Sequence, residues 1–226
     1  EARTKMGECD TAYKQAADVG RSDAISYESI AEAYIQQSEI ARNASKPPKE
    51  FLDQAIEYAG KSITAAPSRA AGYTKKAYAH FWTAYGLLTA QQDPRPEVTK
   101  LVAAAELALK LNPKDAYAFD AIGNGYMAQG YYEFFKGQDP LPSWAKGKQA
   151  IEKAIQIAPK FLWAINDLSL LYLANAKYLL ERGKDPSPDV GKAVRLQSHA
   201  IELFVDYLNS YSSLISTYAI QAVYDK

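Results

Sequence analysis

Hydrophobic and small residues recur along this chain with a period of 46 residues. We aligned the sequence in segments that begin at residues 21, 67, 113, 159 and 205, and similar residues fall in the same columns. The seventh column holds Tyr27, Tyr73, Phe119, Ile165 and Tyr211, whereas the eighteenth holds only small residues, Ser38, Ala84, Gly130, Ala176 and Ala222. The seventh, eleventh, fourteenth and eighteenth columns follow the stripe of one helix face. Each segment therefore predicts a helix whose alternating large and small core residues interlock with neighbouring helices.

The second half of each segment predicts another helix. It ends before a proline in the stretches "LALKLNP" (107–113) and "AIQIAP" (154–159), and its small column holds Ser62, Ala108, Ala154 and Ala200. We therefore expect an all-α chain of about ten helices in a single repeat domain over residues 1–226. The expected repeats are 21–66, 67–112, 113–158 and 159–204, with 1–20 as the second helix of a preceding unit and 205–226 as a final half repeat or capping helix. The first helix of each repeat is expected to run from the fourth to the twenty-fifth column.

A short phrase, Asp-Pro-x-Pro, recurs between the two helices as "QQDPRP" (91–96), "GQDPLP" (137–142) and "GKDPSP" (183–188). Asp139 and Asp185 suit either metal ligands or the capping position of a helix. Gly137 and Gly183 suit the left-handed residue just after a helix, and an aspartate followed by proline suits a helix start. A hard metal ion needs several convergent oxygens, and no such cluster accompanies the phrase. The phrase is therefore predicted to end one helix and begin the next.

The stretch "FDAIGNGY" (119–126) resembles the tetratricopeptide signature, W-x2-L-G-x2-Y, and Ala154 and Pro159 match its closing small residue and proline. The resemblance extends over nearly the whole chain and implies a right-handed superhelical solenoid of antiparallel helix hairpins. The unit departs from the usual 34 residues of this family, because the first helix and the loop are longer. This long variant looks like the repeats that follow the catalytic domain in some bacterial serine/threonine protein kinases, although no kinase motif is present in this sequence.

In the family that this chain resembles, the first helices line a concave groove, and ligand contacts come from columns 5, 8, 9, 12 and 16. The resemblance implies a non-catalytic scaffold whose partner is a protein or an extended peptide. An alternative function is a sensory or regulatory segment of a larger bacterial signalling protein, such as a kinase. The same positions could also be ordinary half-packed groove residues. The candidate groove residues are Lys75, Tyr78, Trp82, Tyr117, Asp120, Asn124, Trp163, Asn166 and Asp167, of which Tyr78, Asn124 and Trp163 are expected to supply much of the binding energy.

Composition further narrows the partners and the chemistry that we expect. Lysine plus arginine and aspartate plus glutamate number 26 each, so no net charge favours nucleic acid or an anionic membrane as a partner. No apolar run approaches the ~20 residues of a membrane span, and no signal peptide is evident. His80 and His199 have no catalytic companions nearby in sequence, and Cys9 is the only cysteine. We expect no enzyme activity, no cofactor, no metal, and no internal disulfide.

Two properties stay open at this point. A single cysteine fits a cytoplasmic chain, which we favour, and also an extracytoplasmic segment of a membrane protein. The last predicted helix, from Leu208 to about Tyr224, has apolar residues but no second helix after it. A repeat stack buries its core only between adjacent units. We therefore expect that the natural chain continues beyond Lys226, or that this helix caps the stack or pairs with a second copy in a homodimer.

Overall fold

The computed structural model describes residue 8, residues 11–12, residue 15 and residues 23–225 of the chain. Cys9 and most of the expected helix over residues 1–20 lie outside the described residues. The described part contains nine long α-helices and no strand. Their bounds are α2 (Ala24–Asn43), α3 (Lys49–Ala65), α4 (Ala70–Thr89), α5 (Arg95–Leu111), α6 (Ala116–Phe135), α7 (Leu141–Ile157), α8 (Leu162–Leu180), α9 (Ser187–Leu203) and α10 (Leu208–Tyr224).

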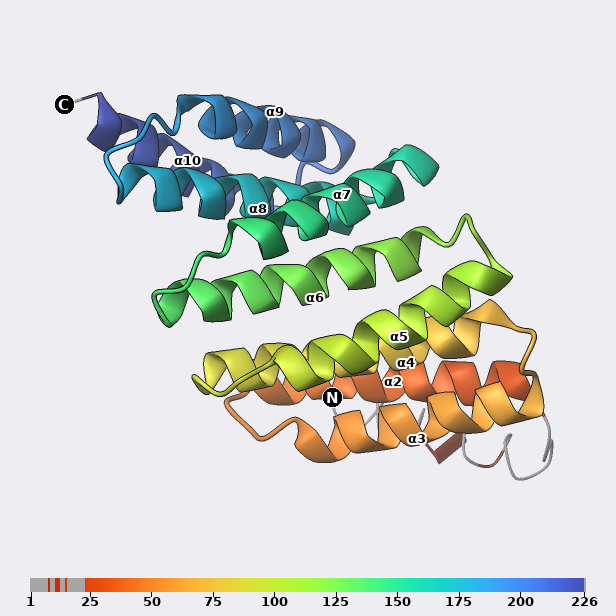
Figure 1. The fold of residues 1–226 in the computed structure, drawn as a ribbon. Coiled ribbons are helices and arrows are strands. Elements are labelled where there is room, and N and C mark those ends of the chain that lie inside the picture. Colours follow the sequence, from red (N-terminus) through yellow and green to blue (C-terminus); the bar gives the residue numbers. More distant parts are fainter. Residues whose placement is uncertain (1–7, 9–10, 13–14, 16–22, 226) are drawn as a thin grey trace.

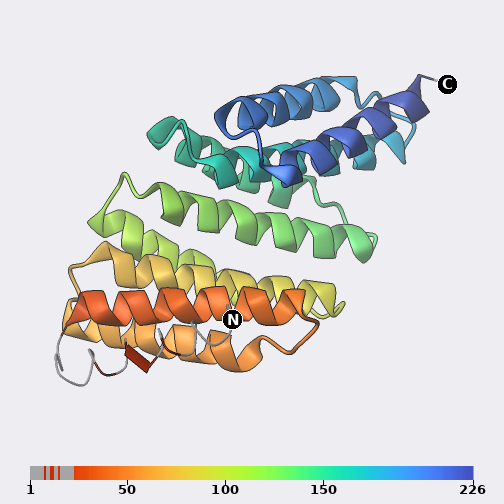
Figure 2. The ribbon, with the colours of Figure 1, turned by 180° about the vertical axis from the view of Figure 1, so that it is seen from behind.

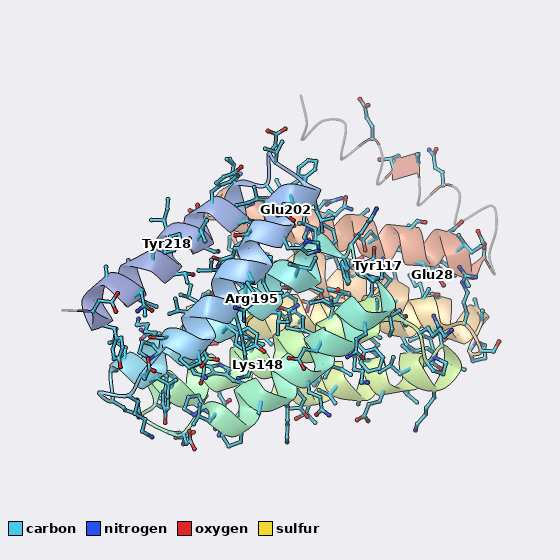
Figure 3. The ribbon with its side chains drawn as sticks, turned by 90° about the horizontal axis from the view of Figure 1, so that it is seen from above. Glu28, Tyr117, Lys148, Arg195, Glu202 and Tyr218 are labelled. Carbon is cyan, nitrogen blue, oxygen red and sulfur yellow. The ribbon has the colours of Figure 1, made fainter. Side chains whose placement is uncertain are left out.

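The helices stack one after another from α2 and α3 at one end to α9 and α10 at the other (Figure 1). Each first helix packs against the second helix that follows it, and also against the first helix of the next repeat. Seen from behind, α2 and α10 lie in front at opposite ends of the stack (Figure 2). Successive helices are rotated relative to one another when the stack is viewed from above (Figure 3). The architecture is therefore the expected all-α solenoid.

The first helices are slightly shorter than the sequence predicts. They contain 20 residues in α2, α4 and α6 and 19 in α8, whereas the prediction extends each one to the twenty-fifth column. The reason is that this column adopts a left-handed backbone, with φ of 55° at Ser45, 58° at Gln91, 71° at Gly137 and 65° at Gly183. The predicted left-handed conformation of Gly137 and Gly183 is therefore confirmed. Because a left-handed residue does not continue an α-helix, each first helix ends two or three residues before this column.

The Asp-Pro-x-Pro phrase begins the second helix. Asp139 Oδ1 accepts the backbone N–H of Leu141 over 3.1 Å, and Asp185 Oδ1 accepts that of Ser187 over 2.8 Å. Pro140, after Asp139, already has helical dihedral angles, φ −82° and ψ −13°. The N-cap is Pro140 rather than the expected Asp139, and the aspartate bonds the N–H of the first helical residue from the position before the cap. The part of the chain that the structure describes contains no group of three or more His, Cys, Asp or Glu residues that could hold a metal ion.

The small-residue columns let helices approach closely. A Cβ atom placed on Gly123 of α6 would lie 2.2 Å from Ile151 Cγ1 of α7, and one on Gly130 would lie 2.3 Å from Trp144 Cδ1. Ile151 and Trp144 are fully buried in the core between these helices. Only glycine leaves room for both large side chains, so the alternation of large and small columns fixes how α6 and α7 pack.

One side of α10, the last of the described helices, is not covered by other described residues. Ile215 is 71% exposed, whereas Ala31 and Ala77 in the same column of earlier repeats are fully buried. Tyr218 of α10 is exposed as well, and it is labelled in Figure 3. No helix among the described residues is both long enough and apolar enough to cross a membrane.

Candidate functional site

The predicted groove residues lie on α4, α6 and α8, which contact one another in sequence order. We use "groove" for the face that these three first helices form. Tyr78 Oη donates to Asp120 Oδ2 over 2.7 Å, and Asn124 Nδ2 donates to Asp167 Oδ2 over 2.9 Å. In both bonds a residue of the twelfth column contacts the eighth or ninth column of the next repeat. These side chains therefore join adjacent repeats, which is a role that the sequence analysis did not assign to them.

Five of the nine predicted residues come together in one polar cluster, which we call the acid pit: Tyr78, Asp120, Asn124, Asn166 and Asp167. The Asn124 amide bridges the two carboxylates, because it also donates to Asp120 Oδ2 over 3.2 Å. Asn166 Nδ2 donates to the second oxygen of Asp167 over 3.3 Å. Asp120, Asn124 and Asn166 are buried, whereas Asp167 and Tyr78 are half-buried. Asp167 and Tyr78 are therefore the members of the pit most accessible from the groove.

Burial dominates the electrostatics of the acid pit. It raises the pKa of Asp120 well above its usual range, and the nearby Asp167 charge raises it further. Burial also raises the pKa of Asp167 to about 6, against the opposing effect of the amide hydrogen bonds from Asn124 and Asn166. The pKa of Tyr78 is raised by burial and by the Asp120 carboxylate, so its hydroxyl stays protonated and donates. The pit thus holds two carboxyl groups that lack the solvation they would have in water.

An aromatic ladder lies beside the pit at the beginnings of α6 and α8. The ring of Tyr117 lies between those of Tyr78 and Phe161, with centroid distances of 6.4 and 4.7 Å, and Phe161 lies 6.2 Å from Trp163. Tyr117 is 52% exposed and Trp163 is 58% exposed, although both are large and apolar. Tyr117 is labelled in Figure 3. These two predicted residues are therefore accessible to a partner.

The remaining two predicted residues are already engaged within the chain. Lys75 Nζ lies 2.7 Å from Glu32 Oε2 of α2. Trp82 is half-buried, and the guanidinium carbon of Arg42 lies 4.1 Å from the centre of its ring. Both contacts join α2 to α4. A ligand at either residue would have to share or replace them.

A hollow lies further along the same helices, and the sequence analysis missed it. This hollow, of about 690 Å³, we call the aromatic cleft; its apolar lining is Tyr85, Leu88, Met127, Tyr131, Tyr132, Phe135 and Leu170. Tyr85 and Tyr131 occupy the nineteenth column and Phe135 the twenty-third. These columns continue the predicted ligand face by one and two further helical turns. The signal was present in the sequence, but the set of groove columns stopped at the sixteenth.

The two histidines of the sequence lie on different helices, His80 on α4 and His199 on α9. His80 is buried, and its Nδ1 lies 2.7 Å from Glu97 Oε2 of α5. Burial lowers the pKa of His80, although the Glu97 carboxylate opposes this effect. The pair is enclosed between a first and a second helix. His199 is exposed and lies 3.7 Å from Glu202 on the same helix.

No protein-family model and no curated protein matches the chain. Its fold is similar to that of TTC0263, a thermophilic TPR protein of Thermus thermophilus, with a TM-score of 0.64, 14% identity, and 96% of this chain and 93% of that chain covered. It is also similar to MamA, with a TM-score of 0.56, 18% identity, and 89% and 94% of the two chains covered. The MamA fragment 41-end from Desulfovibrio magneticus RS-1 gives a TM-score of 0.51, 15% identity, and 91% and 89% coverage. The chain has the fold of a tetratricopeptide-repeat solenoid.

Proposed function

We propose that this chain is a non-catalytic scaffold that binds an extended segment of a partner protein along the groove of α4, α6 and α8. The observation that carries this proposal is the aromatic cleft. A hollow of about 690 Å³ with an apolar lining falls within the size range of protein pockets that bind ligands. Large apolar side chains are normally buried, so an accessible group of them marks an interaction surface.

The occupant that this cleft favours is a peptide with aromatic or aliphatic side chains. Phe135 and Tyr85 supply exposed rings, and Met127 supplies a flexible side chain that adapts to different apolar shapes. Tyr131 also lines the cleft, and a tyrosine hydroxyl can donate a hydrogen bond to a peptide carbonyl. Apolar slots beside a few polar groups are typical of grooves that bind an extended peptide.

The structure changes how the proposal should be tested. Replacing Tyr78, Asn124 and Trp163 together by alanine was the obvious test from sequence. Asn124 is buried, however, and bridges two carboxylates, so its loss would leave both without their shared donor and would also loosen the repeat stack. Trp163, which is mostly exposed, stays a sound position for substitution.

A cleaner test uses the exposed rings of the aromatic cleft. Peptides are selected from a random displayed library on the purified protein, and their affinities are measured by fluorescence anisotropy. The double variant Tyr85→Ala/Phe135→Ala should keep its helical circular dichroism signal and lose at least about tenfold in affinity, since aromatic anchors often carry about 2 kcal/mol or more.

The matched control is Leu107→Ala/Leu111→Ala, which removes two similarly exposed apolar side chains from α5. This control should bind the same peptides with unchanged affinity. Equal binding by the cleft variant and the wild type would contradict the proposal, as would the failure of the library to yield any peptide.

A further inference from the structure

The acid pit has more hydrogen-bond acceptors than donors. Asp120 is 2% exposed and Asn166 is 8% exposed, and the Oδ1 atom of each has no hydrogen-bond partner among the described residues. The donors of the pit, the Tyr78 hydroxyl and the two side-chain amides, are already engaged with the other carboxylate oxygens. Buried acceptors without donors are costly, and they are uncommon in folded proteins unless a ligand or water satisfies them.

The described part of the chain also supplies no cation to the pit. Among the ion pairs between described residues, none includes Asp120 or Asp167. Two carboxylates of α2 differ in this respect. Glu28 is paired with Arg69 over 2.6 Å, and Glu32 with Lys75 over 2.7 Å. The carboxylates in the middle of the groove therefore lack the positive charge that Glu28 and Glu32 receive at the α2 end of the stack.

The pit lies between two apolar surfaces on one helix face. Tyr117 of the aromatic ladder, Asn124 of the pit and Tyr131 of the aromatic cleft are seven residues apart on α6, so they share that face. Seven residues of helix span about 10 Å. Trp163 and Leu170 have the same spacing on α8 and lie on either side of Asp167. A segment that crosses from the ladder to the cleft must pass over the pit.

We propose that the acid pit receives a basic side chain, lysine or arginine, of the peptide that binds in the groove. This inference rests on the proposed function, because the peptide backbone must first lie along α6 and α8. An ammonium or guanidinium group brings both the donors and the charge that the pit lacks, and charged hydrogen bonds of this kind are the strong ones. The Tyr78 ring beside the carboxylates adds an aromatic surface, which also favours a cation.

The spacing makes the proposal specific. An extended peptide advances about 3.3 Å per residue, so about three residues cover the 10 Å from the pit to either apolar surface. The preferred ligand should therefore carry a basic residue with an apolar or aromatic residue about three positions away on each side.

The test is a parallel selection of random displayed peptides, at pH 7.5 and with a chelator present, on three forms of the protein. These are the wild type, Asp167→Asn, and the control Asp53→Asn, which makes the same chemical change at an exposed carboxylate on α3. Wild type and control should select peptides with apolar residues on both sides of a lysine or arginine. Asp167→Asn should still select the apolar residues but show no preference for the basic one.

A chosen peptide and its analogue with glutamine at the basic position then give a quantitative answer by fluorescence anisotropy. On the wild type, the glutamine analogue should bind at least about tenfold more weakly, because it leaves a buried charge without its partner. On Asp167→Asn the two peptides should differ by less than about threefold. Circular dichroism checks that each form is folded.

The outcomes separate the two proposals. Selected peptides that bind the aromatic cleft but show no basic preference on the wild type would overturn the acid-pit assignment and leave the scaffold function standing. An equal basic preference on Asp167→Asn would also overturn it. If no form selects any peptide, the groove does not bind peptides, and both proposals fail together.

Discussion

Replacing Asp167 by asparagine should stabilise the protein at neutral pH and have little effect at low pH. The substitution keeps the size of the side chain and removes its charge. Burial raises the pKa of Asp167 from 3.8 to about 6. The folded chain therefore binds this proton more tightly than the unfolded chain does. The contribution of the group to stability is fully present below the unfolded pKa and is lost as the pH rises through about 6.

The size of the effect follows from the difference between the two pKa values. It is about 2 pH units, and each unit corresponds to about 1.4 kcal/mol, which gives about 3 kcal/mol. Asp167 is only half-buried, so solvent screens part of this, and we expect about 2 kcal/mol. The loss of its charge also relieves Asp120, whose pKa the Asp167 charge raises. Both effects favour the variant at neutral pH.

The assay is urea unfolding, followed by circular dichroism, of wild type and Asp167→Asn at several pH values between about 3.5 and 8 and at constant ionic strength. The quantity of interest is the free energy of unfolding of the variant minus that of the wild type, because groups that the substitution does not affect cancel. This difference should rise by about 2 kcal/mol, mostly between about pH 4 and pH 6.5. A difference that is independent of pH, or that falls as the pH rises, would refute the reasoning.

Three further predictions concern the fold. Gly123→Leu should lower the free energy of unfolding by about 1–3 kcal/mol or more, because the new side chain overpacks Ile151. The control Gly86→Ala, where a Cβ meets nothing within 4 Å, should be neutral or stabilising. Unchanged melting of Gly123→Leu would refute the close approach of α6 and α7. Asp139→Ala should cost about 0.5–2 kcal/mol because the Leu141 N–H at the start of α7 loses its acceptor, and added Ca²⁺ should not alter its melting or that of the wild type; a large calcium-dependent shift would favour a metal site instead. The exposed apolar side of α10 predicts a dimer in light scattering that Ile215→Glu converts to monomer; a wild-type monomer would argue against pairing with a second copy.

Much of the fold could be predicted from the sequence because its signals are local. The helix-face pattern inside each 46-residue repeat, the aspartates before the second helices and the left-handed glycines each act within a few residues of their position. Ser45 and Gln91 adopt the same left-handed backbone without being glycine, so residue type alone was a weaker guide there than position in the repeat.

The groove was harder to predict, for a reason that Asn124 and Asp167 illustrate. Both were predicted from their columns to face the groove, but a column does not tell whether the partner across from it is a ligand or the next helix. Asn124 bonds to Asp167 of α8, which lies 43 positions further along the chain. Contacts between repeats of this kind depend on the superhelical rotation, which no single segment encodes. Trp163, by contrast, stays exposed, as its predicted role requires.

The central claim is that a partner peptide lies in the groove, and photo-crosslinking tests it most directly. A selected peptide with a photoreactive group in place of one apolar residue is irradiated on the intact protein, and the attachment sites are found by mass spectrometry. We expect crosslinks on α4, α6 and α8, concentrated at Tyr85, Tyr131 and Phe135. Crosslinks that fall mainly on the second helices α5, α7 and α9 would contradict the account.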